Sequence, residues 1–356
     1  MNGIRRQQIE SCFELALIFN NGVVVGKNLK IATEWYEKAV SMLPSSSLDQ
    51  TSNHLLYYIG VLYLNGHPGY KKSSAKAMEY LTKSANLMDN VLNRVEYYGS
   101  LRSMTTIGDK WSYEKCYSQA MEWYCKSAEL GEPYALFRIG ILHYNGTGVE
   151  KNNTQAMKWF MKSAEYGDTN AMCEIGRLYH YGRVEKDCKE AMEWYKRSVE
   201  YGNADAMCEI GRLYNNGEGV QKNYKVALEW FEKSAGLDNK KAMCELGKNF
   251  CNGFGLEQDY KKAMEWLLKS SELGYHGAMY FIGTMYQNNI GVEKDYKKAM
   301  EWYLKAADKN HSLAMYKIGN MYWRGKGIEN DDNKAIEWHL KSAKMGVGDS
   351  MRELLW

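Results

Sequence analysis

Apolar and small residues recur along this chain in two interleaved series, with a period of 35 to 36 residues. The stretch AMCEIGRLY occurs at 171–179 and again, letter for letter, at 206–214. The alanine that begins this stretch has equivalents throughout the first series, at Ala135, Ala171, Ala206, Ala242, Ala278 and Ala314. The second series has the pattern A-M-E-W-Y, which begins at Ala120, Ala156, Ala191, Ala227, Ala263, Ala299 and Ala335. Apolar residues follow each opening residue at helical spacing, so each period predicts two helices, which we call helix A and helix B.

The repeating unit is therefore predicted to be a helical hairpin. Weaker copies begin near Ser11, Leu55 and Arg94, which makes nine repeats, and SMRELLW at 350–356 begins a tenth. In helix A an aliphatic residue precedes a glycine, and an aromatic residue stands three positions later, as in Ile175, Gly176 and Tyr179. Glycine inside a helix costs about 1 kcal/mol relative to alanine, so its recurrence predicts close approach by a neighbouring helix.

Helix B carries a tryptophan three residues after its opening alanine. The eight copies are Trp35, Trp123, Trp159, Trp194, Trp230, Trp266, Trp302 and Trp338, and Tyr80 replaces it once. A side chain of this size contributes much of the apolar area of a core, so we expect these residues to be buried and to hold each hairpin together. An aromatic ligand cage is the alternative, but a cage is local, whereas this tryptophan recurs along the whole chain.

Polar residues and glycines mark the ends of the predicted helices. Four residues before the helix B alanine stand the predicted N-caps Asn28, Ser73, Asn152, Asp187, Asn223, Asp259, Asp295 and Asp331. Left-handed backbone is predicted after helix B at Gly131, Gly167, Gly202, Asp238, Gly274, Asn310 and Gly346, and between the helices at G-x-G turns. A glutamate four residues before a base recurs along helix B, as in Glu122 and Lys126, and predicts a solvated face with ion pairs.

Composition and charge exclude several classes of function. The chain has 46 basic and 43 acidic residues, so its net charge of +3 does not favour nucleic acid as a partner. It has no apolar run of transmembrane length and no typical signal peptide, so we expect a cytoplasmic protein, in its own cell or in a host cell, with its eight cysteines reduced. No catalytic triad, carboxylate pair, phosphate loop or metal-ligand spacing stands apart from the repeat, so we predict no enzyme, no catalytic residues, no cofactor and no metal.

Residues 278–310, AMYFIGTMYQNNIGVEKDYKKAMEWYLKAADKN, carry the repeat pattern almost in full. They resemble the Sel-one-like repeat, a relative of the tetratricopeptide repeat. The resemblance is strong over residues 135–349 and irregular over 11–130. The irregularities are extra residues near 43–50, extra residues near 103–111, and Arg102 at a position where an aromatic residue is expected. We therefore divide one continuous solenoid into irregular repeats 1 to 3 (1–130), regular repeats 4 to 9 (131–346) and a partial capping repeat (347–356).

This resemblance implies an all-α, right-handed superhelix of stacked hairpins whose helix A lines the concave side. It also implies a non-catalytic scaffold or adaptor that binds a protein or peptide, and we expect a monomer. A regulatory or structural subunit that docks through its convex face or its N-terminal repeats is the alternative. Members of the family also include host-interaction proteins of intracellular bacteria and large viruses.

The resemblance further places helix A positions two, six and nine after the opening residue in the groove. These partner-binding candidates are Phe137, Ile141, Tyr144, Cys173, Arg177, His180, Cys208, Arg212, Asn215, Lys248, Tyr280, Gln287, Tyr316, Asn320 and Trp323. Arg177, Arg212 and Lys248 align in three consecutive repeats and suggest a partner with acidic groups. A glutamate stands three residues before each of them, so pairing within the helix is the other interpretation.

Overall fold

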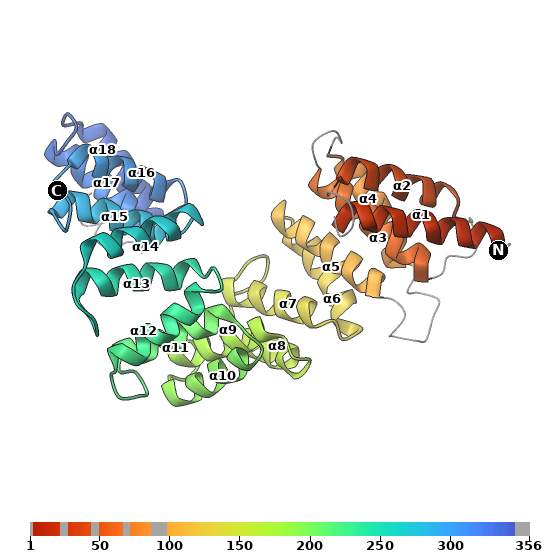
Figure 1. Ribbon diagram of the computed structural model, residues 1–356, viewed down its shortest axis with the longest axis horizontal. Coiled ribbons are helices and arrows are strands. Elements are labelled where there is room, and N and C mark those ends of the chain that lie inside the picture. Colours follow the sequence, from red (N-terminus) through yellow and green to blue (C-terminus); the bar gives the residue numbers. More distant parts are fainter. Residues whose placement is uncertain (1–2, 22–27, 44–49, 67–71, 87–97, 346–356) are drawn as a thin grey trace. The chain divides into compact units, whose positions relative to one another are not determined.

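The computed structural model describes residues 3–21, 28–43, 50–66, 72–86 and 98–345. Every regular element in these ranges is a helix, which confirms the predicted all-α fold (Figure 1). The helices are α1 (Gly3–Asn21), α2 (Leu29–Ser41), α3 (Gln50–Asn65), α4 (Ser74–Asn86), α5 (Tyr98–Tyr113), α6 (Tyr117–Glu129), α7 (Pro133–Asn145), α8 (Asn153–Glu165), α9 (Thr169–His180), α10 (Cys188–Glu200), α11 (Ala204–Asn216), α12 (Tyr224–Ala235), α13 (Lys240–Asn252), α14 (Tyr260–Glu272), α15 (His276–Asn288), α16 (Tyr296–Ala307), α17 (Ser312–Arg324) and α18 (Asp332–Lys344).

Odd-numbered helices are the A helices and even-numbered helices are the B helices of the repeats. Each B helix packs on its own A helix and, within a unit, on the A helix of the next repeat, as α12 does on α11 and α13. The chain divides into two compact units, Met1–Ala171 and Met172–Trp356, which we describe separately. The predicted boundaries between irregular and regular repeats at 130, and between regular repeats and the partial repeat at 346, stay a prediction.

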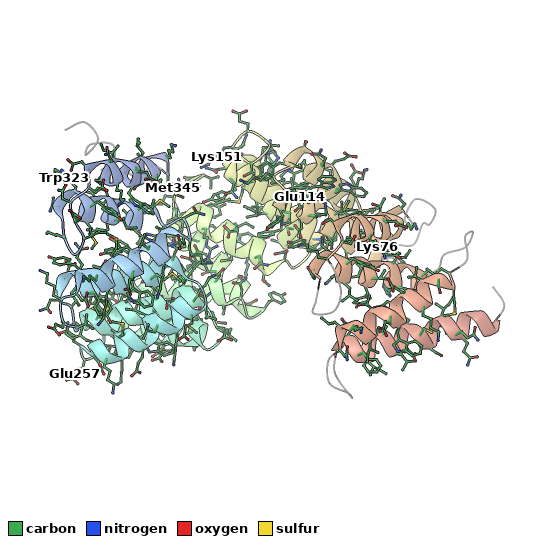
Figure 2. All side chains as sticks on the ribbon, turned by 90° about the horizontal axis from the view of Figure 1, so that it is seen from above. Lys76, Glu114, Lys151, Glu257, Trp323 and Met345 are labelled. Atoms are coloured by element: carbon green, nitrogen blue, oxygen red, sulfur yellow. The ribbon has the colours of Figure 1, made fainter. Side chains whose placement is uncertain are left out.

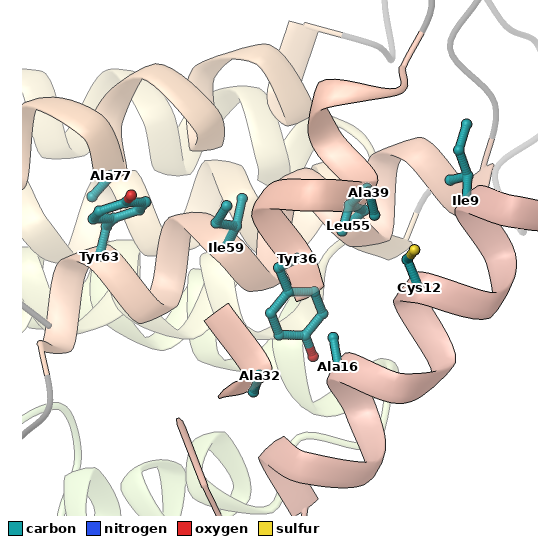
Figure 3. Close-up of a cluster of buried hydrophobic side chains, with 10 residues drawn as sticks. All are labelled: Ile9, Cys12, Ala16, Ala32, Tyr36, Ala39, Leu55, Ile59, Tyr63 and Ala77. Atoms are coloured by element: carbon teal, nitrogen blue, oxygen red, sulfur yellow. The ribbon is translucent and has the colours of Figure 1, made fainter. Parts of the chain in front are cut away.

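The glycine of each A helix lies against a large side chain of the B helix, which confirms the predicted close approach. A Cβ atom on Gly211 would lie 2.6 Å from the ring of Phe231, and one on Gly283 would lie 2.7 Å from the ring of Tyr303. In the first repeat Tyr36 of α2 points at Ala16 of α1, and both are fully buried (Figure 3). A small residue at this position is therefore required for the two helices to approach each other.

The side chain that fills this contact is the residue after the tryptophan, not the tryptophan itself. Tyr36, Tyr124, Phe160, Tyr195, Phe231, Leu267 and Tyr303 are fully buried at this position, whereas the preceding tryptophans are only partly buried. The prediction that the tryptophans are buried was wrong, because the A helix meets the next position along helix B and leaves them only partly buried. The tryptophans instead pack at the edge of the core.

A basic side chain lies over each of these tryptophans. Lys305 Nζ lies 4.1 Å from the centre of the Trp302 ring, and Lys341 Nζ lies 4.2 Å from that of Trp338. The predicted ion pair with the glutamate four residues earlier forms in Glu122–Lys126, at 3.0 Å, and in Glu337–Lys341, at 2.7 Å. The same bases therefore serve two contacts, and the cation–π contact, worth about 0.5 to 1 kcal/mol at an exposed site, is the more regular one.

The predicted helix ends are confirmed wherever the structure describes them. Asn152 Oδ1 accepts a hydrogen bond from Gln155 N at 2.9 Å, and Asp295 Oδ1 accepts one from Lys298 N at 2.9 Å. Backbone φ is positive after helix B at Gly202, Asp238 and the equivalent residues. Gly346, the extra residues 44–49 and the fragment 347–356 lie outside the described residues.

The third repeat has a different register from the predicted one. Helix α5 runs without interruption through 103–111, and a Cβ atom on Gly108 would lie 2.6 Å from the ring of Tyr124. The pattern of this repeat is therefore Ile107, Gly108 and, three residues later, Trp111. The prediction of extra residues at 103–111 was wrong, and so was the prediction that Arg102 occupies the aromatic position. The connection from α5 to α6 is shorter than in the other repeats, and this shifted the alignment of the third repeat with them.

Three further features bear on function. All eight cysteines are free. Among the described residues, no three His, Cys, Asp or Glu side chains come together in a way that could hold a metal ion. No described helix combines the length and the apolar character needed to cross a membrane.

Candidate protein-binding surface

The A helices of the second unit lie against one another, with α11 touching α13 and α13 touching α15. The side chains at positions two, six and nine after each opening residue lie on one side of these helices, and we call this surface the A face. It contains the predicted partner-binding residues from Cys173 to Trp323. Their surroundings differ between the first three of these helices and the last two.

Acidic and basic side chains alternate along the A face of α9, α11 and α13. Arg177 is paired with Glu174 on its own helix, and its Nε donates to Glu209 Oε1 of the next repeat at 3.1 Å. Asp205 Oδ2 lies 3.7 Å from Arg177 Nη2 and adds a second contact to the next repeat. The guanidinium therefore joins two repeats.

The pattern repeats one step further along the chain. Arg212 Nη1 lies 3.3 Å from Glu209 Oε1 on its own helix, and Nη2 lies 3.0 Å from Glu245 Oε1 of the following repeat. Lys248 Nζ lies 3.3 Å from the same Glu245 oxygen. We call Glu174, Arg177, Glu209, Arg212, Glu245 and Lys248 the ion-pair ladder. Its three acids balance its three bases, so it carries no net charge.

Glu209 is the centre of the ladder. It is 2% exposed, and besides the two arginines it accepts a hydrogen bond from Tyr181 Oη at 3.1 Å. Burial alone would raise the pKa of this carboxyl, yet the guanidiniums of Arg212 and Arg177 hold the pKa below its ordinary value. A buried carboxylate with three donors is a structural group whose loss leaves the two arginines without their shared partner.

Three of the predicted partner-binding residues are buried beneath the ladder. Cys173 and Cys208 belong to the hydrophobic core, and burial raises the pKa of the Cys208 thiol to about 12. His180 is also buried, with Nε2 2.9 Å from Glu218 Oε2 and its ring stacked on Tyr181. These side chains do not reach the surface, so we leave them out of the proposed binding surface below.

The A face of α15 and α17 is aromatic, and the guanidinium carbon of Arg324 lies 5.5 Å from the centre of the Trp323 ring. Tyr280 stacks on His311, with ring centres 4.8 Å apart, and Gln287 Oε1 accepts a hydrogen bond from Tyr303 Oη at 2.6 Å. Tyr316 packs against the ring of His339. These contacts hold one side of each aromatic ring against the protein and leave part of each ring accessible to solvent.

Trp323 and Asn320 lie at the end of this surface. Trp323, labelled in Figure 2, is 46% exposed. The Oδ1 atom of Asn320, one helical turn away, is buried and accepts no hydrogen bond from the described residues. The exposed ring can take an apolar side chain of a partner, whereas a donor cannot reach the buried Oδ1 atom from solvent.

Four predicted residues remain, three in the first unit and one on the A face of the second. Phe137, Ile141 and Tyr144 belong to the first unit and are partly buried, and Phe137 packs on Phe160 with ring centres 5.8 Å apart. Asn215 of α11 is partly buried, and its Oδ1 accepts no hydrogen bond from the described residues. Whether any of these residues contacts a partner stays a prediction.

Sequence reasoning did not identify the histidine beside this surface. His311 Nδ1 accepts a hydrogen bond from Ala314 N at 3.1 Å and thereby caps α17. Burial, with nearby His276 and Lys248, lowers its pKa to about 4. The repeats themselves could have indicated this cap, because the residues equivalent to His311 in two other repeats are Asn203 and Asn239, which are typical N-caps.

Comparison with known proteins shows the same repeat. A Sel1 repeat protein from Oxalobacter formigenes has 28% sequence identity and a TM-score of 0.56, over 67% of this chain and 98% of that one. The protein c5321, a protective antigen of uropathogenic Escherichia coli with an SLR fold, has 27% identity and a TM-score of 0.51, over 97% of this chain and 80% of that one. The chitin synthase regulator SKT5 of Saccharomyces cerevisiae is 27% identical over 146 residues, which are 39% of this chain but only 18% of the yeast protein.

The Sel1 repeat model matches most of the chain, in nine segments. The matched residues are 9–42, 54–87, 117–132, 133–168, 169–203, 204–239, 240–275, 276–311 and 312–347. The shortest match, 117–132, covers helix B of the third repeat, whose helix A has the altered register described above. Proteins of this kind are generally non-catalytic scaffolds for protein interactions. The chain belongs to the Sel1 repeat family.

Proposed function

We propose that this chain is a scaffold that binds a protein or peptide segment on the A face of α15 and α17. The observation that carries the proposal is the exposure of Trp323 at the end of this aromatic surface. Tyr280 and Tyr316 extend the same aromatic surface over two repeats. The segment would place an apolar side chain against these rings.

The ion-pair ladder argues against an acidic segment as the main ligand. An acidic group would have to compete with Glu174, Glu209 and Glu245 for the three basic side chains, which are already paired. The gain from a new ion pair would be offset by the loss of an existing one. We therefore place the main contact beyond the ladder, toward the C-terminal end of the A face. The monomeric state and a cytoplasmic location stay predictions.

The test is selection of binding peptides from a random display library with the intact chain. Affinity is then measured for Trp323→Ala, for Asn320→Ala and for the control Tyr113→Ala. Tyr113 is 88% exposed on α5 of the other unit. We expect Trp323→Ala to weaken binding about tenfold or more and Asn320→Ala to weaken it less, while the control binds as the wild type does. Equal affinity of the wild type and Trp323→Ala would overturn the proposal.

A second surface has a specific feature in its favour. Pockets lie between consecutive B helices at equivalent repeat positions, one in each unit, and each has a tryptophan and its overlying lysine in its wall. The first is lined by Trp159, Lys162 and Tyr166, among others, and the second by Trp266, Lys269 and Leu273. Docking through these B helices is the alternative function, and peptides selected above would then lose affinity in Trp266→Ala rather than in Trp323→Ala.

A further inference from the structure

A charged pair links α5 and α7 in the first unit, in the reverse order to the ladder. In the observed register of the third repeat Asp109 follows Gly108 directly, so it occupies the sixth position of helix A, where the ladder has its bases. Arg138 stands three residues after Ala135 and occupies the third position, where the ladder has its acids. Arg138 Nε lies 3.1 Å from Asp109 Oδ1. The same two positions therefore meet, with acid and base exchanged.

Two tyrosines hold the acid of this pair. Tyr124 Oη donates a hydrogen bond to Asp109 Oδ1 at 2.6 Å, and Tyr134 Oη donates one to Asp109 Oδ2 at 3.0 Å. The guanidinium carbon of Arg138 lies 5.6 Å from the centre of the Tyr124 ring and 5.9 Å from that of the Tyr134 ring. Both carboxylate oxygens therefore have a donor other than Arg138, and the two rings position the arginine.

Arg138 has fewer acidic partners than the arginines of the ladder. Each ladder arginine contacts a carboxylate of its own helix and one of the next repeat. Among the acidic side chains that the structure describes, Asp109 alone is paired with Arg138. Helix α7 has Ala135 three residues before Arg138 and Ile141 three residues after it, so it supplies no acid at this spacing.

One nitrogen of the Arg138 guanidinium is free to bind a ligand. Nη2 donates a hydrogen bond to Ser112 Oγ at 3.4 Å, whereas Nη1 donates none to a residue within the described ranges and is not buried. The arginine side chain is 28% exposed. A guanidinium offers five N–H donors in one plane, and carboxylates are among its strongest acceptors. A second carboxylate can therefore bind from solvent.

An apolar side chain adjoins this free nitrogen. Ile141 follows Arg138 by three residues, so it lies on the same side of α7, and it is only partly buried. The combination of a cation and an aliphatic surface suits a segment in which an acidic residue stands beside an apolar one. The aromatic surface of α15 and α17 lacks this combination.

We propose that Arg138 binds an aspartate or glutamate side chain of a partner protein and that an apolar residue beside this acid packs on Ile141. The bound carboxylate gives Arg138 the second acid that each ladder arginine has within the chain. An acidic ligand at the ladder would have to displace an existing partner, whereas here Nη1 is free and Asp109 keeps its tyrosine donors. The inference is independent of the A-face proposal, because all its residues lie in the first unit.

The test uses two fluorescein-labelled octapeptides, one of alternating glutamate and leucine and a neutral copy with glutamine in place of each glutamate. Their affinities for the intact chain are measured by fluorescence anisotropy. We expect the acidic peptide to bind about tenfold more tightly than the neutral one. Arg138→Gln should bring this ratio close to one. The control Arg197→Gln should leave the ratio unchanged, because Arg197 is an exposed arginine over the Trp194 ring of α10.

A second variant tests the site while Arg138 stays in place. Ile141→Glu puts a carboxylate three residues after Arg138, where it can pair with the free nitrogen from within the chain. The ratio of the two affinities should again fall close to one. The matched control Ile141→Gln should weaken both peptides to a similar extent and keep the ratio. This pair decides the question even if Arg138→Gln does not fold.

Three results would overturn the proposal. One is equal binding of the two peptides by the wild type. Another is an unchanged ratio in Arg138→Gln or in Ile141→Glu. The third is the same loss of preference in Arg197→Gln as in Arg138→Gln, which would show a general attraction between the acidic peptide and basic side chains.

Discussion

The A face carries two kinds of side chain at equivalent positions of the repeat. In α9, α11 and α13 the sixth position holds Arg177, Arg212 and Lys248, each paired with glutamates of its own or the next repeat. In α17 the same position holds Asn320, whose Oδ1 atom is buried without a donor. The comparison teaches that a repeat position has no fixed role, because the neighbouring repeat decides whether a polar group is already paired.

The largest expected effect comes from breaking the ladder at its centre. Glu209→Gln removes the charge that Arg177 and Arg212 share, and it should lower the free energy of unfolding by about 3 kcal/mol, since both guanidiniums stay partly buried. Urea denaturation measures this change. The comparison variant Asn320→Ala should stay within about 0.5 kcal/mol of the wild type, because it removes no existing bond. Similar losses in the two variants would contradict the difference between the two regions.

A smaller effect should separate geometry from charge in the ladder. Arg212→Lys keeps the positive charge but replaces the guanidinium with an ammonium group. The guanidinium contacts Glu209 and Glu245 simultaneously, whereas the ammonium is a single point of contact. We expect a loss of about 1 kcal/mol, measured by the same denaturation. Peptides selected on the intact chain should bind this variant with unchanged affinity. If the substitution instead abolished peptide binding and left stability unchanged, the ladder would belong to the binding surface.

The smallest effect concerns the pH dependence of stability beside α17. The pKa of His311 is lowered from 6.5 to about 4 by burial and by His276 and Lys248, so the unfolded chain binds a proton more readily than the folded chain. Its contribution to stability is therefore complete above pH 6.5 and is lost as the pH falls toward 4. His311→Asn keeps an N-cap acceptor and should reduce this acid dependence in melting curves recorded from pH 7 to pH 4. An unchanged slope would show that His311 does not titrate in this way.

Much of the fold followed from the period of the sequence alone. The opening alanines, the helix A glycines and the N-cap residues are set by local sterics and hydrogen bonding, which repeat with the chain. The burial of the residue after Trp302, and the position of Lys305 over that tryptophan, depend on the angle between the two helices. Sequence spacing does not determine that angle, and for this reason the tryptophan was placed too deep in the core.

The candidate site was less predictable than the fold. The spacing of Glu174 and Arg177 indicated a pair within one helix, but the bond from Arg177 to Glu209 depends on how two repeats stack. Burial of Cys173 and His180 likewise depends on the neighbouring A helix. Trp323 was a groove candidate from its repeat position, but the same position holds the buried His180, so spacing alone did not predict that Trp323 is exposed.

The most direct test of the central claim is the hydrogen-exchange footprint of a selected peptide on the intact chain. The account predicts slower exchange in residues 312–324 and 276–288 on binding, with little change in 169–180 and 240–252. Protection centred on the ladder helices, or on the B helices, with no change at 312–324 would contradict it.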